Sequence, residues 1–305
     1  MIVYSPSQRY RDYLQSALPS HIRVSDTPQE ASVFVSGTLK GEDVHDQLKA
    51  VIIPFAGHNG IDLDAIESNN IALFNTQAHA VYVAEMALKL TLGIMGNVQF
   101  YHNELRHGRW AHRNSGARIP WVTLIGKNVG IYGYGAIGQH FARLIEPFNT
   151  TIHVIDRGKD YGACTTHSSL SSMVRASDVV LIAAPLKAST KHAFDDSILS
   201  AMDDTFLINV GRGAIVEQSA LYSALVRGTL KGYAADVWYT YPTGSEPQDP
   251  SIHPLHTLDN VLLSPHFGGF NDQAQEKMRQ QVLATITAID QGDYTGALSI
   301  EKLKE

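Results

Sequence analysis

The sequence predicts the α/β class, with doubly wound parallel sheets in more than one domain. Short, continuously apolar runs alternate with amphipathic stretches along almost the whole chain. This is the pattern of strands that are buried on both faces and covered by helices. The 305 residues also exceed what one hydrophobic core usually organises. We therefore expect two domains, each built from β–α units.

The expected strands are short apolar runs, most of them bounded by polar or turn-forming residues. They lie at Ile2–Tyr4, Val33–Val35, Val51–Pro54, Ala72–Phe74, Val129–Tyr132, Thr151–Ile155, Val179–Ala183, Phe206–Val210, Tyr233–Asp236 and Val261–Ser264. Between them, apolar residues recur at helical spacing. These stretches predict helices at Ser7–Ala17, Ile61–Ser68, Val83–Leu105, Ala136–Phe148, Leu170–Ala176, Ile198–Met202, Glu217–Arg227 and Asp272–Asp290.

The order of these elements does not divide the chain into two simple halves. Residues 1–78 hold one set of β–α units, and residues 79–269 hold a second, longer set. The tail, residues 270–305, is mainly helical and has no clear strand of its own. We expect it to return to the first domain, which would make that domain discontinuous. A tail helix that completes the second domain is the alternative.

Composition and charge argue against several classes of protein. Lys and Arg number 24 against 30 Asp and Glu, a net charge of −6, which offers nothing to attract a phosphate backbone. The single cysteine, Cys164, allows neither an intrachain disulfide nor a thiolate cluster for zinc, and no metal is predicted. Apolar runs such as Val179–Leu186 are far shorter than the ~20 residues that cross a bilayer. Since the N-terminus lacks the apolar core of a signal peptide, we expect a cytoplasmic protein that binds neither nucleic acid nor membrane.

A glycine-rich segment, VGIYGYGAIG at residues 129–138, reads as a strand, a turn and the start of a helix. In a dinucleotide-binding turn the first glycine permits the tight bend, the second lets the pyrophosphate approach the backbone, and the third lets helix and strand pack closely. Gly133, Gly135 and Gly138 have this spacing. The strand before them and the helix after them are the context that such a motif needs.

The residues after the turn suit the remainder of a dinucleotide. Free N–H groups at the start of the helix, at Ala136 and Ile137, would meet the phosphates. Asp156 ends the next expected strand, where a carboxylate can accept hydrogen bonds from the ribose hydroxyls of the adenosine. Because this carboxylate would repel a 2′-phosphate, NAD is expected rather than NADP. The neighbouring Arg157 would attract a 2′-phosphate, so the sequence leaves open how strict the preference for NAD is.

Three further segments are INVGRGAIV at residues 208–216, GYAADVW at 232–238 and SPHFGG at 264–269. With AGHNGID at 56–62, Asn75-Thr76, Val83–Glu85 and Pro185-Leu186, they resemble the D-isomer-specific 2-hydroxyacid dehydrogenase family over essentially the whole chain. The resemblance implies two Rossmann-like or flavodoxin-like domains with a cleft between them. Residues 1–78 and 270–305 would bind the substrate, and residues 79–269 would bind NAD. The implied reaction is the interconversion of a 2-oxo acid and a D-2-hydroxy acid.

The resemblance also implies roles for single residues, and their chemistry fits. Arg212 can hold carboxylate and keto oxygens with paired donors. A histidine has an ordinary pKa of about 6.5 and suits reversible proton transfer, so His266 would be the general acid and base. The remaining candidates are Gly57, His58 and His79 for the substrate, and Pro185, Thr190, Val210 and Asp236 for the nicotinamide end of the cofactor.

One position departs from the family. Most members place there a glutamate that pairs with the histidine, and this chain has Tyr241. A carboxylate beside imidazole raises its pKa, and a neutral phenol does not. The hypothesis is that His266 works without a carboxylate partner. Two alternatives stay open, namely an NAD-responsive binding protein resembling a corepressor and a formate-type dehydrogenase. The family also implies a homodimer, with Tyr82–Trp121 as the candidate contact.

Overall fold

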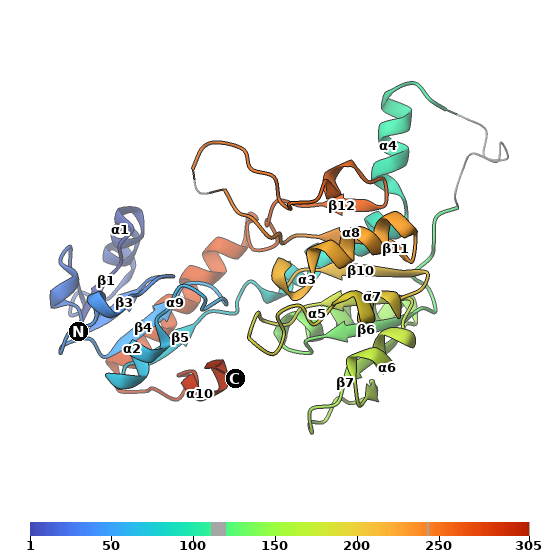
Figure 1. Ribbon diagram of the computed structural model, residues 1–305. Helices are drawn as coiled ribbons and strands as arrows, with labels where there is room; N and C mark the ends of the chain where they lie inside the picture. The colour runs from blue at the N-terminus through green and yellow to red at the C-terminus, as the bar shows by residue number, and fades with distance from the viewer. Residues whose placement is uncertain (111–119, 243, 305) are drawn as a thin grey trace. The chain divides into compact units, whose positions relative to one another are not determined.

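The computed structural model describes residues 1–110, 120–242 and 244–304 (Figure 1). The chain forms two compact units. The first comprises Met1–His79 and Asn271–Glu305, and the second comprises Ala80–Phe270. Each unit is built on a parallel sheet, as the α/β pattern predicts.

The first unit contains a five-stranded sheet in the order β2-β1-β3-β4-β5, with every pair of neighbours parallel. Its strands are β1 (Ile2–Tyr4), β2 (Arg23–Val24), β3 (Val33–Val35), β4 (Ala50–Ile53) and β5 (Ala72–Asn75). Its helices are α1 (Gln8–Ala17), α2 (Leu63–Ser68), α9 (Ala274–Asp290) and α10 (Ile300–Lys304), with 3₁₀ turns η1 (Pro28–Glu30) and η2 (Gly41–Asp43).

The C-terminal segment completes the core of this unit on both faces of its sheet. Val282 and Ile286 of α9 are buried with Val33 of β3 in one cluster. Ile300 of α10 packs against the other cluster, which contains Phe34 of the same strand. Because successive residues of a strand point to opposite faces, α9 and α10 cover opposite sides of the sheet.

The second unit contains a seven-stranded parallel sheet in the order β12-β11-β10-β9-β6-β7-β8. Its strands are β6 (Asn128–Tyr132), β7 (Thr151–Ile155), β8 (Thr165–His167), β9 (Val179–Ile182), β10 (Thr205–Asn209), β11 (Leu230–Ala235) and β12 (Val261–Leu263). Its helices are α3 (Ala80–Met95), α4 (Val98–Arg106), α5 (Ala136–Ile145), α6 (Leu170–Arg175), α7 (Asp196–Ser200) and α8 (Gln218–Arg227), with η3 (Glu146–Phe148), η4 (Gly213–Ile215) and η5 (Leu255–Thr257).

The strand order of the second unit reverses between β6 and β9. The chain runs from β6 outward to β7 and β8, then returns to the other side of β6 to place β9. Loops after β6 and β9 therefore leave the sheet in opposite directions, and ligands of doubly wound sheets bind at such a switch point, beyond the carboxyl ends of the strands. The glycine turn follows β6 and lies at this point.

One expected helix is wrong in its extent. The sequence predicts a continuous helix over Val83–Leu105, whereas the chain bends by 61° between α3 and α4. Asn97 adopts a left-handed conformation with φ of 50°, which an α-helix cannot continue. Among the described residues no single helix is long and apolar enough to cross a membrane. Only the bent pair together reaches that length and composition.

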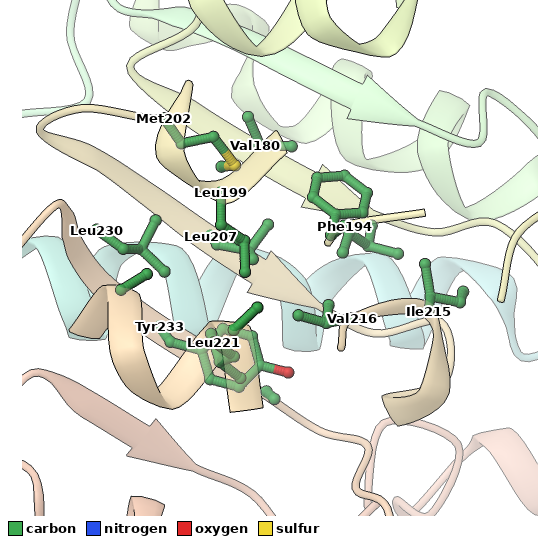
Figure 2. Packing of buried hydrophobic residues seen from close by; sticks show 14 of the residues in the cluster. Val180, Phe194, Leu199, Met202, Leu207, Ile215, Val216, Leu221, Leu230 and Tyr233 are labelled. Atoms are coloured by element: carbon green, nitrogen blue, oxygen red, sulfur yellow. The ribbon is translucent and has the colours of Figure 1, made fainter. Parts of the chain in front are cut away.

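A large aromatic side chain anchors one of the two cores of the second unit (Figure 2). Phe194 is fully buried and lies edge-on to Tyr132, with ring centroids 5.4 Å apart. Phe194→Ala should lower the free energy of unfolding by about 3–5 kcal/mol, because it removes buried apolar surface and leaves a cavity. Urea unfolding followed by circular dichroism measures the loss. Val226→Ala, at a position that is 59% exposed, should lower the free energy of unfolding by less than ~0.5 kcal/mol. Equal losses of stability in the two variants would contradict the role of Phe194 in the core.

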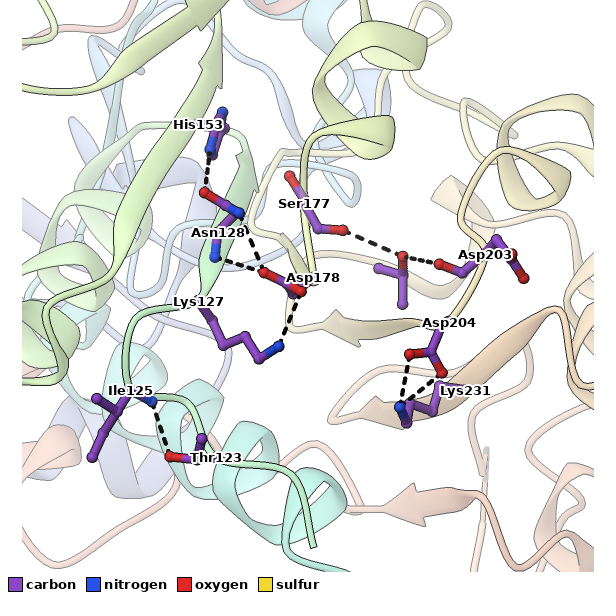
Figure 3. A network of polar contacts seen from close by, with 11 residues as sticks. Thr123, Ile125, Lys127, Asn128, His153, Ser177, Asp178, Asp203, Asp204 and Lys231 are labelled. Atoms are coloured by element: carbon purple, nitrogen blue, oxygen red, sulfur yellow. Dashed lines mark hydrogen bonds and ion pairs between the residues drawn. The ribbon is translucent and has the colours of Figure 1, made fainter.

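A chain of polar contacts joins β7 to the start of β6 (Figure 3). His167 extends this chain to β8. The Nδ1 atom of buried His153 lies 2.8 Å from Nε2 of His167, and its Nε2 lies 3.2 Å from Oδ1 of Asn128. Asp178 accepts hydrogen bonds from the backbone N–H of Asn128 at 2.9 Å and from Lys127 at 3.1 Å. Burial lowers the pKa of His153, as does His167, while Asp178 acts in the opposite sense.

This lowered pKa makes stability depend on pH. Below about pH 6.5 the unfolded chain binds a proton at His153 more readily than the folded chain does. The free energy of unfolding should therefore fall as the pH drops through about 6.5 and level off below the folded pKa. His153→Gln should flatten this decline, whereas His102→Gln, on an exposed helix position, should leave it unchanged. Urea titrations between about pH 7.5 and 5 test this, and identical slopes for the parent and His153→Gln would refute it.

Candidate functional site

Glycine is needed for a different structural reason at each of the three positions of the turn after β6. Gly133 has φ of 104°, and a Cβ there would lie 2.5 Å from the backbone nitrogen of Ala184. A Cβ at Gly138 would lie 2.5 Å from the carbonyl oxygen of Gly133. At Gly135, which caps α5, a Cβ would meet nothing within 4 Å. The turn is thus packed closely at its two ends and open at its centre, the shape that a phosphate approaching the backbone requires.

The other candidates in the second unit follow carboxyl ends of strands. Because the strands are parallel, these ends lie along one edge of the sheet. Pro185 follows β9, and Thr190 closes its loop by donating to the carbonyl oxygen of Pro185 at 2.7 Å and accepting from the N–H of Lys187 at 2.8 Å. The residues along this edge are Ala136, Ile137, Asp156, Arg157, Pro185, Val210, Arg212, Asp236 and His266.

The segment after β7 forms a tight turn at the adenosine end of the expected dinucleotide site. Oδ1 of Asp156 accepts a hydrogen bond from the N–H of Gly158 at 2.8 Å, which fixes the carboxylate close to the strand end. The N–H of Arg157 donates to the hydroxyl of Tyr161 at 3.0 Å. Both Asp156 and Arg157 are exposed. The turn therefore presents an anionic and a cationic side chain side by side, as the sequence suggests.

Asp236 holds the loop that carries His266. Asp236 is only 2% exposed, and its carboxylate accepts three hydrogen bonds, from the hydroxyl of Ser264 at 2.6 Å and from the N–H groups of Phe267 at 2.8 Å and Gly268 at 2.7 Å. A Cβ at Gly268 would lie 2.8 Å from this carboxylate. Between these anchors His266 takes φ of 64°, in the left-handed region. Charged hydrogen bonds to a buried carboxylate are strong enough to keep a non-glycine residue in that conformation.

Arg212 stands in a turn that buried Asn209 organises. The side chain of Asn209 accepts from the N–H of Gly211 and donates to the carbonyl oxygen of Arg212, both at 3.0 Å. A Cβ at Gly213 would lie 2.3 Å from the carbonyl oxygen of Trp238, so the turn requires glycine there. Asn209 and Ser264 are positioning residues that sequence reasoning missed. A polar residue at the end of an otherwise apolar strand is the signal that could have found Asn209.

His266 has an unusual environment for a general acid. Its pKa lies below the ordinary value, first because burial of the ring disfavours the charged form and then because Arg212 repels it, while Asp236 acts in the opposite sense. Part of the residue remains exposed, so solvent moderates the effect. Its ring centroid lies 5.4 Å from that of Tyr241, with 55° between the planes. The structure therefore brings together Arg212, Asp236, Tyr241 and His266.

The remaining candidates belong to the first unit. Gly57 and His58 follow β4, and His79 follows the adjacent β5, so all three come after carboxyl ends of parallel strands. The side chain of Asn75, at the end of β5, donates to the carbonyl oxygen of Ala56 at 2.8 Å. This bond ties the segment before Gly57 to the neighbouring strand.

Comparison with known proteins identifies the family. Residues 88–268 match the family model described as the NAD binding domain of D-isomer specific 2-hydroxyacid dehydrogenases. The chain is 32% identical to D-3-phosphoglycerate dehydrogenase of Escherichia coli K12 over 252 residues, covering 81% of this chain and 60% of that protein. It is 30% identical to glyoxylate reductase of Pyrococcus furiosus over 263 residues, covering 83% of this chain and 76% of that protein.

A solved structure extends this similarity. The NADPH-dependent glyoxylate/hydroxypyruvate reductase of Sinorhizobium meliloti, in complex with NADP and malonate, matches with a TM-score of 0.81 and 27% identity, covering 98% of this chain and 97% of that one. The chain spans about 60% of the length of the first curated relatives that it matches. Its seven-stranded unit carries the NAD-binding domain of the family. The chain belongs to the D-isomer specific 2-hydroxyacid dehydrogenase family.

Proposed function

We propose that this chain is an NAD-dependent oxidoreductase that interconverts a 2-oxo acid and a D-2-hydroxy acid. The observation that carries the proposal is the loop held by Asp236, which presents His266 close enough to Arg212 for the guanidinium to lower the pKa of the imidazole. A cation that binds a carboxylate, next to a proton donor and acceptor, is the arrangement that 2-oxo acid reduction needs.

The cofactor site fits a dinucleotide. The open backbone at Gly135 and the start of α5, with Ala136 and Ile137, would hold the pyrophosphate, and Asp156 would accept from the ribose hydroxyls. Bound NADH supplies a hydride to the carbonyl carbon of the substrate. We propose NAD rather than NADP, since the exposed carboxylate of Asp156 would repel a 2′-phosphate.

The chain's own residues perform the remaining steps. Arg212 would hold the substrate carboxylate and keto oxygen. Gly57 and His58, in the first unit, are further candidates for substrate binding. As negative charge develops on the keto oxygen, protonated His266 would donate its proton to that oxygen. In the oxidation of the hydroxy acid, neutral His266 would accept the same proton. His79 is a further candidate for substrate contact.

The relatives indicate which substrates to test first. Glyoxylate, hydroxypyruvate, pyruvate and bulkier 2-oxo acids should be assayed by the loss of NADH absorbance, with NADPH as the alternative donor. NADH-dependent reduction of any of these acids would support the proposal. NADH binding without turnover across the panel would favour the binding-protein alternative. Oxidation of formate with NAD, without reduction of 2-oxo acids, would favour the formate-type alternative.

We also propose a homodimer in the cytoplasm, where NAD is available. Val98 and Leu105 of α4 are 60% and 54% exposed, and Trp110 and Trp121 are 83% and 67% exposed. Large exposed apolar side chains gathered on one segment are typical of a protein interface. Residues 111–119 of the expected contact Tyr82–Trp121 lie outside the described residues. Sedimentation equilibrium tests the dimer, and a monomer at every concentration would refute it.

A further inference from the structure

Tyr241 and the loop that carries His266 are both hydrogen-bonded to the same buried tryptophan, Trp238. The hydroxyl of Tyr241 accepts a hydrogen bond from the backbone N–H of Trp238 at 3.3 Å. The indole Nε1–H of Trp238 donates to the carbonyl oxygen of Ser264 at 2.8 Å, two residues before His266. Trp238 is itself only 7% exposed, so it is a rigid support for both loops. The contact between the two rings is therefore held from both sides.

The imidazole of His266 has few other partners in the site. Among the described residues, no carboxylate forms an ion pair with His266 and no side chain hydrogen-bonds to its ring. Both oxygens of Asp236 are already engaged by the loop that carries His266. The ring lies against Tyr241, whose ring centroid is 5.4 Å away at a tilt of 55°.

We propose that Tyr241 is a positioning residue for His266, whose ring, tethered through its hydroxyl to Trp238, orients the imidazole without supplying negative charge. The proposal rests on the function proposed above and adds how its proton donor is held. Aromatic rings at such tilted geometry attract each other beyond the effect of the apolar area they bury. This attraction favours one rotamer of an imidazole to which no other described side chain hydrogen-bonds.

A neutral tyrosine beside His266 affects the protonation of the imidazole differently from a carboxylate. The charged groups that act on His266 are Asp236, after β11, and Arg212, after β10, and their effects oppose each other. Tyr241 adds no charge that would favour the imidazolium. The protonated form needed for reduction is therefore lost at a lower pH than in an enzyme with a carboxylate beside the imidazole. The neutral form needed for oxidation remains available at neutral pH.

Three substitutions at Tyr241 test separately the contributions of its hydroxyl, of its ring and of the absent negative charge. Tyr241→Phe keeps the ring and should leave the pH midpoint of reduction unchanged, with a small loss of kcat. Tyr241→Leu removes the ring and should lower kcat for reduction by about 10- to 100-fold with little change in KM, because the donor is misplaced. Tyr241→Glu should raise the pH midpoint of kcat/KM for reduction by about one unit or more, because it adds an opposite charge beside the imidazole.

The second unit offers a matched control. Tyr222 of α8 stacks on His253, just before η5, with ring centroids 5.0 Å apart and 10° between the planes. Tyr222→Glu makes the same change in charge beside a histidine and should leave the profile of reduction unmoved. Urea unfolding midpoints of all variants establish that each one folds.

A second readout does not depend on turnover. The pKa of His266 can be followed by NMR titration of its ring C–H signals, assigned by their loss in His266→Gln. Tyr241→Glu should raise this pKa, while Tyr222→Glu should not. An unmoved pKa in Tyr241→Glu, or a kcat for Tyr241→Leu equal to that of the parent, would overturn the positioning role. If Tyr241→Glu raises the pKa of His266 but the parent reduces no 2-oxo acid, the contact between the two residues would be supported and the proposed function refuted.

Discussion

Replacing His266 with glutamine is expected to lower kcat/KM for 2-oxo acid reduction by about 10²- to 10⁴-fold, the usual contribution of a positioned general acid. Glutamine can still donate a hydrogen bond to the keto oxygen, but it cannot transfer a proton. The remaining rate should also lose the pH dependence of the parent between about pH 5 and 8. The affinity for NADH should stay within about twofold of the parent, because the glycine turn lies after β6 and His266 after β12.

Steady-state kinetics across pH, together with NADH fluorescence titration, measure both effects. His256→Gln is the control, since this histidine is exposed in η5 of the same unit. It should reduce 2-oxo acids as the parent does. A His266→Gln variant that retains the parent's rate and pH profile would show that another group delivers the proton. Loss of NADH binding in that variant would instead indicate that the loop held by Asp236 supports the cofactor site.

The regular part of the fold was predictable because apolar runs and their spacing determine it. The strands Ile2–Tyr4, Val33–Val35 and Thr151–Ile155 are confirmed to the residue. Two edge strands, β2 and β8, were not predicted. Arg23–Val24 is too short to carry a pattern, and Thr165–His167 is polar and partly exposed. Both become strands only because β1 and β7 present free backbone groups beside them.

The prediction of one continuous helix over Val83–Leu105 was wrong because the sequence pattern does not show where the helix ends. Apolar residues continue through the break, so hydrophobic periodicity does not reveal it. The signal is the pair Gly96-Asn97, because asparagine tolerates the left-handed conformation that ends a helix. A single Gly-Asn pair in an apolar stretch is a weak local preference, and tertiary packing decides whether it becomes a bend.

The candidate site was predictable as a set of residues but not as a set of contacts. Parallel strands bring their carboxyl ends to one edge, which is why Arg212 and His266 could be expected together. That Asp236 binds the Ser264–Gly268 loop depends on partners far away in sequence, and no spacing rule gives it. The sequence shows that Tyr241 departs from the family. Only the structure shows that its ring contacts His266 and that its hydroxyl is tethered to Trp238.

Arg212→Gln is the second substitution with a large expected effect. Removing a charged partner of a bound carboxylate costs about 2–5 kcal/mol, or about 30-fold to several-thousand-fold in kcat/KM. The loss should appear chiefly as a higher KM for the 2-oxo acid. Arg212→Lys keeps the charge but not the planar pair of donors, and should fall between the parent and Arg212→Gln.

The same substitution makes an independent prediction about His266. Arg212 lowers the pKa of His266, so removing its charge should raise that pKa, and the remaining reduction should extend to higher pH. Arg212→Lys should leave the pKa near that of the parent. Arg227→Gln, on the exposed end of α8, is the control and should change neither KM nor the profile. A parent-like KM in Arg212→Gln would mean that another group anchors the carboxylate, whereas a raised KM with an unmoved pKa would mean that the guanidinium lies farther from the imidazole in the working enzyme.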